Sequence, residues 1–262
     1  MLTGGSGGLG RAAGDAMAAA GCEVLAPTHD RLNLASLRSV RDFAASLEGP
    51  LHAIVCNAGI QLVGPTTFTE DGFETTFQVN HLAHFLLVAL LRDRLAPDGR
   101  VVVVSSGTHD PDRRTGMPAP RYTTAQELAR PAPSHSAAEG RRRYTTSKLS
   151  NVLFAYELAR RAPLAANAFD PGLMPGTGLA RDYRPFQKLV WDRVLPALTR
   201  VAPNLNTTEQ SGRALARLVT DPALRAVTGA YFLGERPRGS SIASYDRDKA
   251  RDLWETSERL MA

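Results

Sequence analysis

The stretch TGGSGGLG at residues 3–10 constrains the fold of this chain more than any other feature. Gly4, Gly8 and Gly10 permit positive φ angles and a close approach of backbone to ligand, and the alanine-rich run that follows predicts a helix. A helix N-terminus offers free N–H groups and a positive dipole end to an anion. The pattern predicts a phosphate-binding loop, although alone it also fits a flexible glycine-rich tail. The candidate contacts are Thr3, Gly4, Ser6, Gly8, Leu9 and Gly10.

Helices and strands are predicted to alternate after this loop, which is typical of a Rossmann-type doubly wound parallel sheet in the α/β class. The run RVVVVSS is too apolar for a strand with one wet face, as expected in a sheet covered on both sides. No interdomain linker is visible, so we expect one domain over 1–262, with a long loop at 107–143. Strands are expected at 22–27, 51–59, 100–106, 164–172 and 229–233, and helices at 11–20, 36–47, 69–95, 144–161, 208–219 and finally up to 260.

The region around the first strand departs from this pattern. Only Met1 and Leu2 precede the glycine loop, where the fold needs a central strand. A sheet without that strand would leave backbone groups unpaired in the core. We therefore expect the first strand to be truncated and the native protein to have a few more residues upstream. The segment before the second helix is also short, so the third strand is expected to be little more than residues 32–34.

Composition excludes several classes of protein. The chain has a net charge of +5 and is 43% hydrophobic, which is ordinary for a globular protein with a sizeable core. No nucleic-acid reader motif, metal-ligand cluster, signal peptide or membrane span is visible, so we expect a cytoplasmic protein without metal or nucleic acid. Cys22 and Cys56 lie in apolar contexts and are expected to be small core residues. The basic run 141–143 is interpreted as a solvated loop.

Tyr144 and Lys148 in YTTSK are predicted to share one face of a helix, because they stand at i and i+4. Lowering the pKa of a tyrosine from ~10 to about 7 requires roughly 4 kcal/mol of preferential stabilisation of the phenolate. A nearby ammonium and an oxidised nicotinamide ring can supply it. Tyr144 is therefore a candidate general acid/base that exchanges a proton with a carbonyl or alcohol oxygen during hydride transfer. An exposed helix pair is the alternative for this short motif.

These motifs, in this order, resemble the short-chain dehydrogenases/reductases. The resemblance covers nearly the whole chain and implies a Rossmann-type sheet and NAD(P)-dependent hydride transfer. It rests on TGGSGGLG, CNAG, Asn80 in FQVNHLAHFLL, VVVVSS, YTTSK and DPG.

The resemblance also implies roles for individual residues. Tyr144 would be the acid/base, Lys148 would lower its pKa and hold the nicotinamide ribose, and Ser106, rather than Ser105, would bind the substrate oxygen. Asn80 would anchor a water in the proton relay. The remaining cofactor contacts implied are Asn57, Ala58, Gly59, Pro171, Gly172 and Thr177.

A narrower resemblance is to the branch holding retinol dehydrogenases and light-dependent protochlorophyllide reductases. It favours NADP(H), with NAD(H) possible, because neither Asp30 nor Arg31 stands clearly where the cofactor's 2′ position is read. Those photoenzymes have a cysteine after the Pro-Gly pair, where this chain has Leu173, which favours an ordinary dark oxidoreductase. A non-catalytic dinucleotide-binding protein and a photoenzyme remain the alternatives.

The resemblance further implies a substrate lid at about 177–206. Its Leu, Val, Phe, Tyr and Trp content favours a hydrophobic small-molecule substrate, although these residues also fit a lid that only packs onto the body. A homo-oligomer formed through the helices carrying Asn80 and Tyr144 is expected from the family.

Overall fold

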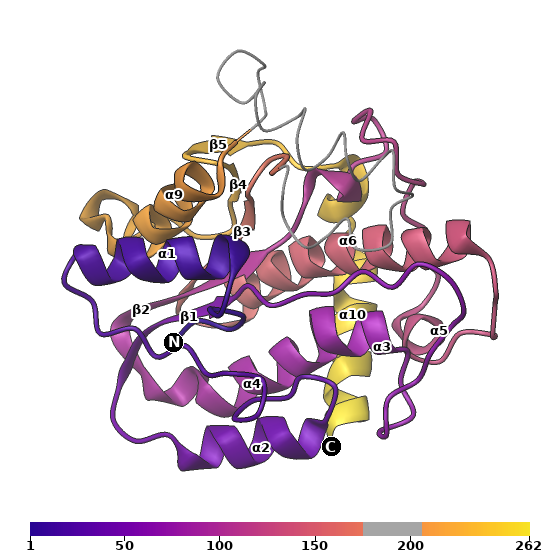
Figure 1. Ribbon diagram of the computed structural model, residues 1–262, viewed down its shortest axis with the longest axis horizontal. Helices are drawn as coiled ribbons and strands as arrows, with labels where there is room; N and C mark the ends of the chain where they lie inside the picture. Colours follow the sequence, from indigo (N-terminus) through magenta and orange to yellow (C-terminus); the bar gives the residue numbers. More distant parts are fainter. Residues whose placement is uncertain (175–205) are drawn as a thin grey trace.

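A five-stranded sheet organises the protein, as described by a computed structural model for residues 1–174 and 206–262 (Figure 1). The strand order follows the sequence, with parallel pairs from β1 to β4 and an antiparallel pair between β4 and β5. This confirms the predicted Rossmann-type α/β class. The strands are β1 (Leu51–Cys56), β2 (Leu95–Val104), β3 (Ala165–Asp170), β4 (Tyr231–Leu233) and β5 (Arg236–Arg238).

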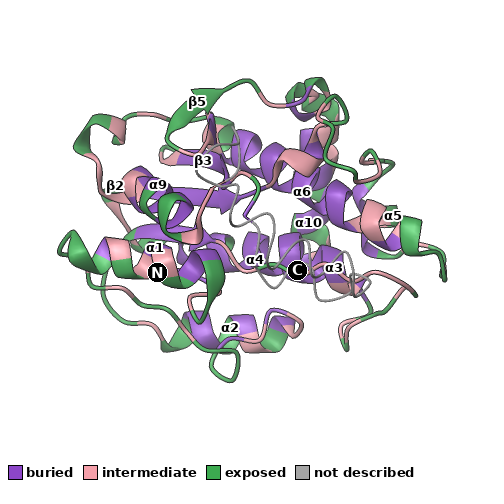
Figure 2. Ribbon diagram, turned by 45° about the horizontal axis from the view of Figure 1, so that its top comes forward, coloured by how far each residue is buried: buried purple, intermediate pink, exposed green. Residues whose placement is uncertain are grey.

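Helices cover both faces of the sheet because its strands carry apolar side chains on both sides. In β1, Ile54 and Cys56 face one core and Val55 faces the other. Buried residues are concentrated on the strands and on the helix faces turned toward them (Figure 2). One core is covered by α1 (Gly8–Ala19) and α9 (Thr208–Thr220), and the other by α2 (Leu37–Ser46), α4 (Ala83–Leu91), α6 (Ala137–Arg161) and α10 (Arg247–Met261).

The place of the expected first strand is taken by Met1–Thr3, which form an isolated parallel bridge to β1. The amide of Val55 donates to Met1 O at 2.9 Å, and the amide of Thr3 donates to Val55 O at 3.0 Å. On the other side, Leu2 N donates to Leu25 O at 2.8 Å. Leu2 is 1% exposed. These few residues therefore form hydrogen bonds with the backbone of Val55 and Leu25 on either side. The Leu2 side chain fills the core at this position.

The strands predicted at 22–27 and 32–34 are wrong. Neither range forms a strand in the structure, although Leu32 and Leu34 are buried. A strand exists only where a neighbour offers a row of backbone partners. The bridge at Leu2 offers residues 22–27 a single such partner, so the extended segment has no ladder to join.

The helix predicted from Thr69 begins later. Its first turn is α3 (Thr75–Phe77), whose N-cap is Glu74 rather than Thr69. A π-helical turn, η1 (Gln78–Leu82), then leads into α4, and the short 3₁₀ turn η2 (Arg92–Arg94) follows it. π turns often mark functional positions, and this one contains Asn80.

Residues 107–143 are predicted to form one long loop. This prediction is wrong, because the segment contains regular structure. It holds the 3₁₀ turn η3 (Gly107–His109), the helix α5 (Ala125–Ala129) and the beginning of α6, which Ser136 caps. Arg141–Arg143 therefore lie on a helix. No sequence pattern predicted the strand β5 or the turns η6 (Pro222–Leu224) and η7 (Ile242–Tyr245).

The C-terminal helix α10 packs on α6, and its side chains also reach α4. The Trp254 ring meets Phe85 edge-on at 5.1 Å between centroids and lies 6.0 Å from Phe154. Ser257 Oγ lies 2.9 Å from His81 Nε2. None of the helices in the described ranges is long and apolar enough to cross a membrane.

We expect acid to destabilise this fold through His81 and His84. Burial lowers the pKa of His81 to about 3 and that of His84 to about 4. Below pH ~6.5 the unfolded chain takes up protons that the folded chain does not, so stability falls as pH falls. Each histidine should cost about 2 kcal/mol between pH 8 and pH 5, measured by urea unfolding at both pH values.

His81→Gln should reduce this pH dependence by about 2 kcal/mol, whereas the matched change at the exposed His52 should leave it intact. An unchanged dependence in His81→Gln would contradict the assignment to buried histidines.

Candidate active site

A cavity of about 1460 Å³ opens at the carboxyl ends of β1, β2 and β3. Ligands in open α/β sheets bind outside the carboxyl ends of the strands, so this is where the fold places a site. All predicted site residues in the described ranges line this cavity except Asn80, which is fully buried beside it. The lining includes the glycine loop, Asn57 to Gly59, Ser106, Tyr144, Lys148, Pro171 and Gly172.

The glycine loop closes tightly on itself. Gly4 has a φ of +68°, and a Cβ on Gly10 would lie 2.0 Å from Gly4 O, so neither position tolerates a side chain. Helix α1 begins at Gly8, and its N-cap Gly7 has no side chain to satisfy the first N–H groups. The residues of this first turn line the cavity. Their free N–H groups can therefore bind an anionic phosphate there.

Asn57 holds the glycine loop from the end of β1. Its side-chain Nδ2 donates to Thr3 O at 2.8 Å and to Gly4 O at 3.3 Å. The amides of Asn57 and Ala58 both donate to the Thr3 hydroxyl, at 2.9 and 3.0 Å. In this structure the Asn57 side chain thus serves the loop.

His84 continues this network toward Asn80 and was missed in the sequence. Burial lowers the pKa of His84 to about 4, so the ring is neutral, and the carbonyl oxygen of Asn80 can only accept. Nδ1 therefore carries the ring proton, and Nε2 accepts from the Thr3 hydroxyl, 2.9 Å away. His84 Nδ1 then donates to Asn80 O at 3.3 Å, which makes the ring a neutral bridge. The second histidine of the motif NHLAH, one helical turn after Asn80, was the available signal.

Asn80 uses its whole side chain to hold other parts of the site. Its Oδ1 accepts from Ile60 N at 2.8 Å, and its Nδ2 donates to Ile60 O and to Ser147 Oγ, each at 2.9 Å. It therefore joins the loop after β1 to helix α6.

Tyr144 and Lys148 lie on one face of α6 at the cavity wall, as their spacing predicted. Both are nearly buried, at 5% and 4% exposure. Lys148 Nζ donates to Val104 O at 3.2 Å and lies 5.7 Å from the centre of the Tyr144 ring. Burial lowers the pKa of Lys148 to about 8, while the charge of Asp170 acts in the opposite direction. Lys148 therefore remains mostly protonated at neutral pH.

The two serines after β2 have different environments. Ser105 is buried, and its Oγ donates to Lys148 O at 2.7 Å, so it fixes the helix backbone. Ser106 is only half-buried, and its Oγ accepts weakly from Thr108 N at 3.3 Å. Its hydroxyl proton is thus available to a ligand, as the assignment of the catalytic serine to Ser106 requires.

The turn after β3 is held from two sides. Asp170 Oδ1 accepts from Gly172 N at 2.9 Å, and Pro171 O accepts from Asn206 Nδ2 and Ser211 Oγ at 2.8 and 2.7 Å. The capping box of Thr207 and Gln210 fixes the start of α9, which carries Ser211. The predicted contact Thr177 and nearly all of the predicted lid lie outside the described residues.

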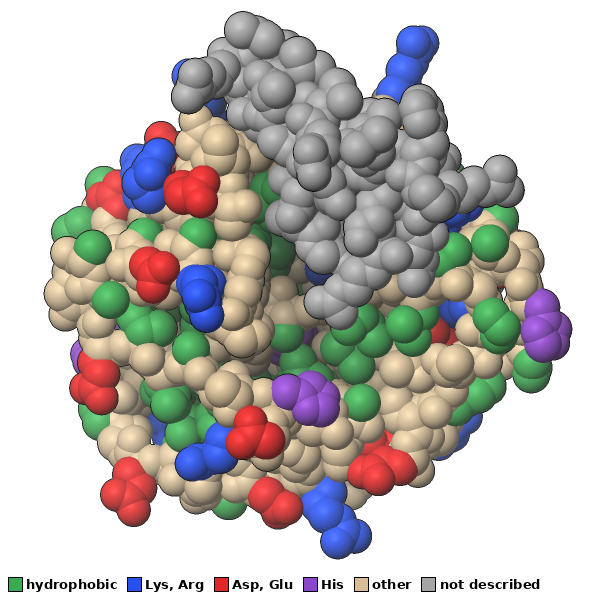
Figure 3. All heavy atoms as spheres, viewed as in Figure 1, with side chains coloured by type: hydrophobic (Ala, Val, Ile, Leu, Met, Phe, Trp, Pro, Cys, Tyr) green, Lys and Arg blue, Asp and Glu red, His purple; other side chains and the backbone are tan. Residues whose placement is uncertain are grey.

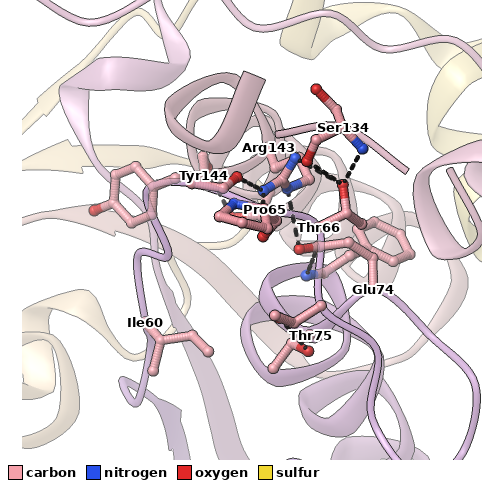
Figure 4. A network of polar contacts seen from close by, with 12 residues as sticks. Ile60, Pro65, Thr66, Glu74, Thr75, Ser134, Arg143 and Tyr144 are labelled. Carbon is pink, nitrogen blue, oxygen red and sulfur yellow. Dashed lines mark hydrogen bonds and ion pairs between the residues drawn. The ribbon is translucent and has the colours of Figure 1, made fainter. Parts of the chain in front are cut away.

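Arg143, next to Tyr144, lies at the centre of a buried polar network, so the interpretation of 141–143 as a solvated loop is wrong (Figure 4). Its Nε lies 3.2 Å from Glu74 Oε1, and Glu74 is 1% exposed. Its other nitrogens donate to Gly64 O at 2.9 Å and to Thr66 Oγ1 at 3.2 Å. The Tyr144 ring points away from this network (Figure 4). Arg143 therefore ties the loop after β1 and the start of α3 to α6.

Comparisons with known proteins agree with this geometry. The family model for short chain dehydrogenases matches residues 33–119. The WW domain-containing oxidoreductase of Danio rerio is 37% identical over 238 residues, which cover 88% of this chain and 54% of that protein. Protochlorophyllide reductase A of Oryza sativa subsp. japonica is 31% identical, over 100% of this chain and 80% of its own length. This chain belongs to the short-chain dehydrogenase/reductase family.

Solved structures show the same fold. A crystal structure of a putative uncharacterized protein from Mycobacterium paratuberculosis has a TM-score of 0.65 and 30% identity, covering 91% of this chain and 75% of that one. A blue fluorescent protein from a metagenomic library, solved in complex with NADPH, has a TM-score of 0.62 and 21% identity, covering 89% and 96%. The chain spans about half the length of the WW domain-containing relatives that it matches.

We expect Arg143→Met to destabilise the protein by about 3 kcal/mol or more, because it leaves the buried Glu74 carboxylate without its cation. The double variant Arg143→Met, Glu74→Gln should recover a large part of the loss, since it removes both charges and keeps the N-cap acceptor of α3. Urea unfolding at pH 7 measures both effects. Arg141→Met is the matched control on the same helix and should cost far less; equal losses at 141 and 143 would refute the role of the ion pair.

Proposed function

We propose that this oxidoreductase transfers a hydride between a nicotinamide cofactor and the carbonyl or alcohol group of a small molecule, with Tyr144 as general acid/base. The observation that carries the proposal is the burial of Tyr144 and Lys148 together at a cavity that also contains the glycine loop. A buried ammonium favours the phenolate of a neighbouring tyrosine. In carbonyl reduction the Tyr144 hydroxyl gives its proton to the substrate oxygen, and the Ser106 hydroxyl donates a hydrogen bond to that oxygen.

The residues around the cavity fit a nicotinamide dinucleotide, which would supply the hydride. The glycine loop and the N-terminus of α1 would hold the pyrophosphate, as the close approach of Gly10 to Gly4 indicates. Gly59, Pro171 and Gly172 line the cavity further along. The narrower resemblance favours NADP(H) over NAD(H), while solved structures of the same fold hold NADPH in one case and NADH in another.

Apolar side chains contribute to the lining of the cavity, which supports a hydrophobic substrate body. Ile60, Leu62, Met117, Met174 and Leu233 line it. The photoenzymes carry a cysteine directly after the Pro-Gly pair. This chain has the exposed Leu173 at that position and therefore no thiol there. This favours a dark reaction over photoreduction.

We also propose that the protein is cytoplasmic and that it self-associates. α10 packs against the helices that carry Asn80 and Tyr144, through Trp254 and Ser257. An oligomer that uses those helices would therefore have to include α10 in its interface.

We expect Tyr144→Phe to lower kcat at least about 10²-fold while NADPH affinity changes little, because the variant loses the proton donor but keeps the cavity wall. Steady-state reduction of an aldehyde panel and titration of Trp fluorescence with NADPH measure the two quantities. Tyr156→Phe on the same helix is the control, since Tyr156 binds Ser240 away from the cavity. Undiminished turnover in Tyr144→Phe would refute the acid/base role of Tyr144. NADPH binding without any turnover by the native protein would favour the non-catalytic alternative.

A further inference from the structure

A cluster of charged side chains lies beyond Ser106, at the end of the cavity away from the glycine loop. Arg113, in the segment after η3, places its Nη1 3.1 Å from Asp170 Oδ2, and its Nε lies 3.7 Å from Asp110 Oδ2. The Arg113 side chain is 31% exposed and the residue lines the cavity. Two carboxylates thus fix the position of the Arg113 side chain, while part of that side chain remains exposed and accessible to a ligand.

Asp170 has no capacity left to bind a substrate. It is 2% exposed, and its two oxygens accept from Gly172 N, from Arg113 and from the Tyr231 hydroxyl, the last at 2.7 Å. Burial beside this carboxylate raises the pKa of Tyr231, so Tyr231 stays a neutral donor. The role left to Asp170 is to orient Arg113, as a buried carboxylate does for a planar guanidinium.

Three arginines against Asp110 and Asp170 leave a net positive charge near this end of the cavity. Arg114 and Arg238 also line it, and within residues 1–174 and 206–262 neither has an ion-pair partner. Arg238 lies opposite Tyr231 in the β4–β5 pair, and His109 Nε2 accepts from Ser241 N at 3.1 Å, which fastens η3 to the segment after β5. The three arginines therefore all line the cavity, and Arg113 is the one in contact with Asp170.

A dinucleotide does not account for this charge. Its pyrophosphate would lie at the glycine loop and the N-terminus of α1, and a 2′-phosphate would lie on the adenosine side, near residues 27–31. We propose that the substrate carries a carboxylate in addition to its reacting carbonyl or alcohol, and that Arg113, oriented by Asp170, binds this carboxylate. The inference rests on the proposed function, and it assigns substrate specificity to residues that no motif of the sequence indicated. Asp170 acts as a positioning residue, through Arg113.

The test compares 4-carboxybenzaldehyde with its neutral methyl ester, methyl 4-formylbenzoate, as substrates with NADPH. The native protein should favour the acid by at least about tenfold in kcat/KM, which corresponds to ~1.4 kcal/mol. Arg113→Gln should abolish the preference and Arg113→Lys should retain part of it. The paired variant Arg113→Gln, Asp170→Asn should also lack it, and leaves no unpaired buried carboxylate to compromise folding. Arg121→Gln, at an exposed arginine paired with Glu139, is the control.

A second measurement separates this inference from the proposed function. Binding of the two compounds to the NADPH complex of Tyr144→Phe, followed by calorimetry, requires no turnover. Tenfold tighter binding of the acid that disappears in an Arg113→Gln background supports the carboxylate site even if neither compound is reduced, and the failure then falls on the proposed reaction. Equal affinities, no binding of either compound, or a preference that survives Arg113→Gln would overturn it and leave Arg113 as the counter-ion of Asp170 alone.

Discussion

The attachment of the glycine loop to the end of β1 is the interaction on which the rest of the site depends. Two amides and one amide side chain, all from residues 57–58, converge on Thr3 and Gly4. The bridge of Leu2 and Thr3 to Val55 brings the loop to this place. Because His84 extends the network to Asn80, the nucleotide end of the cavity and the helix turn beside Tyr144 are fixed by one continuous set of buried hydrogen bonds.

Buried charges are placed around the cavity so that each has a counter-charge or hydrogen-bond partners. Lys148 is buried beside the charge of Asp170, Asp170 pairs with Arg113, and Glu74 pairs with Arg143. Such pairs contribute little net stability, because desolvation offsets most of the attraction. Their geometry is specific, however, and it orients the loop after β1, helix α6 and the turn after β3 toward one space. They are better understood as orienting groups than as sources of stability.

The sequence predicted the sheet, its central strands and the Tyr144–Lys148 face because these depend on local periodicity and on motifs of fixed spacing. It failed where a long-range partner decides the outcome. Residues 22–27 have strand propensity but no ladder to join, and Arg143 looks like one of three surface arginines until the fold brings the buried Glu74 to it. Asp170 stood in the quoted DPG motif, but only the arrival of Arg113 and Tyr231 from distant segments gives it a function.

The two ends of the cavity are therefore built differently. The nucleotide end consists of backbone groups and glycines, where almost any side chain would collide, as at Gly10. The opposite end consists of long side chains from the segment after η3 and from β5, which vary without disturbing the sheet. Under the proposed function, this division lets specificity change through residues such as Arg113 while the groups proposed for hydride and proton transfer stay in place. The arginine-rich rim is accordingly the part of this chain from which its substrate is most directly inferred.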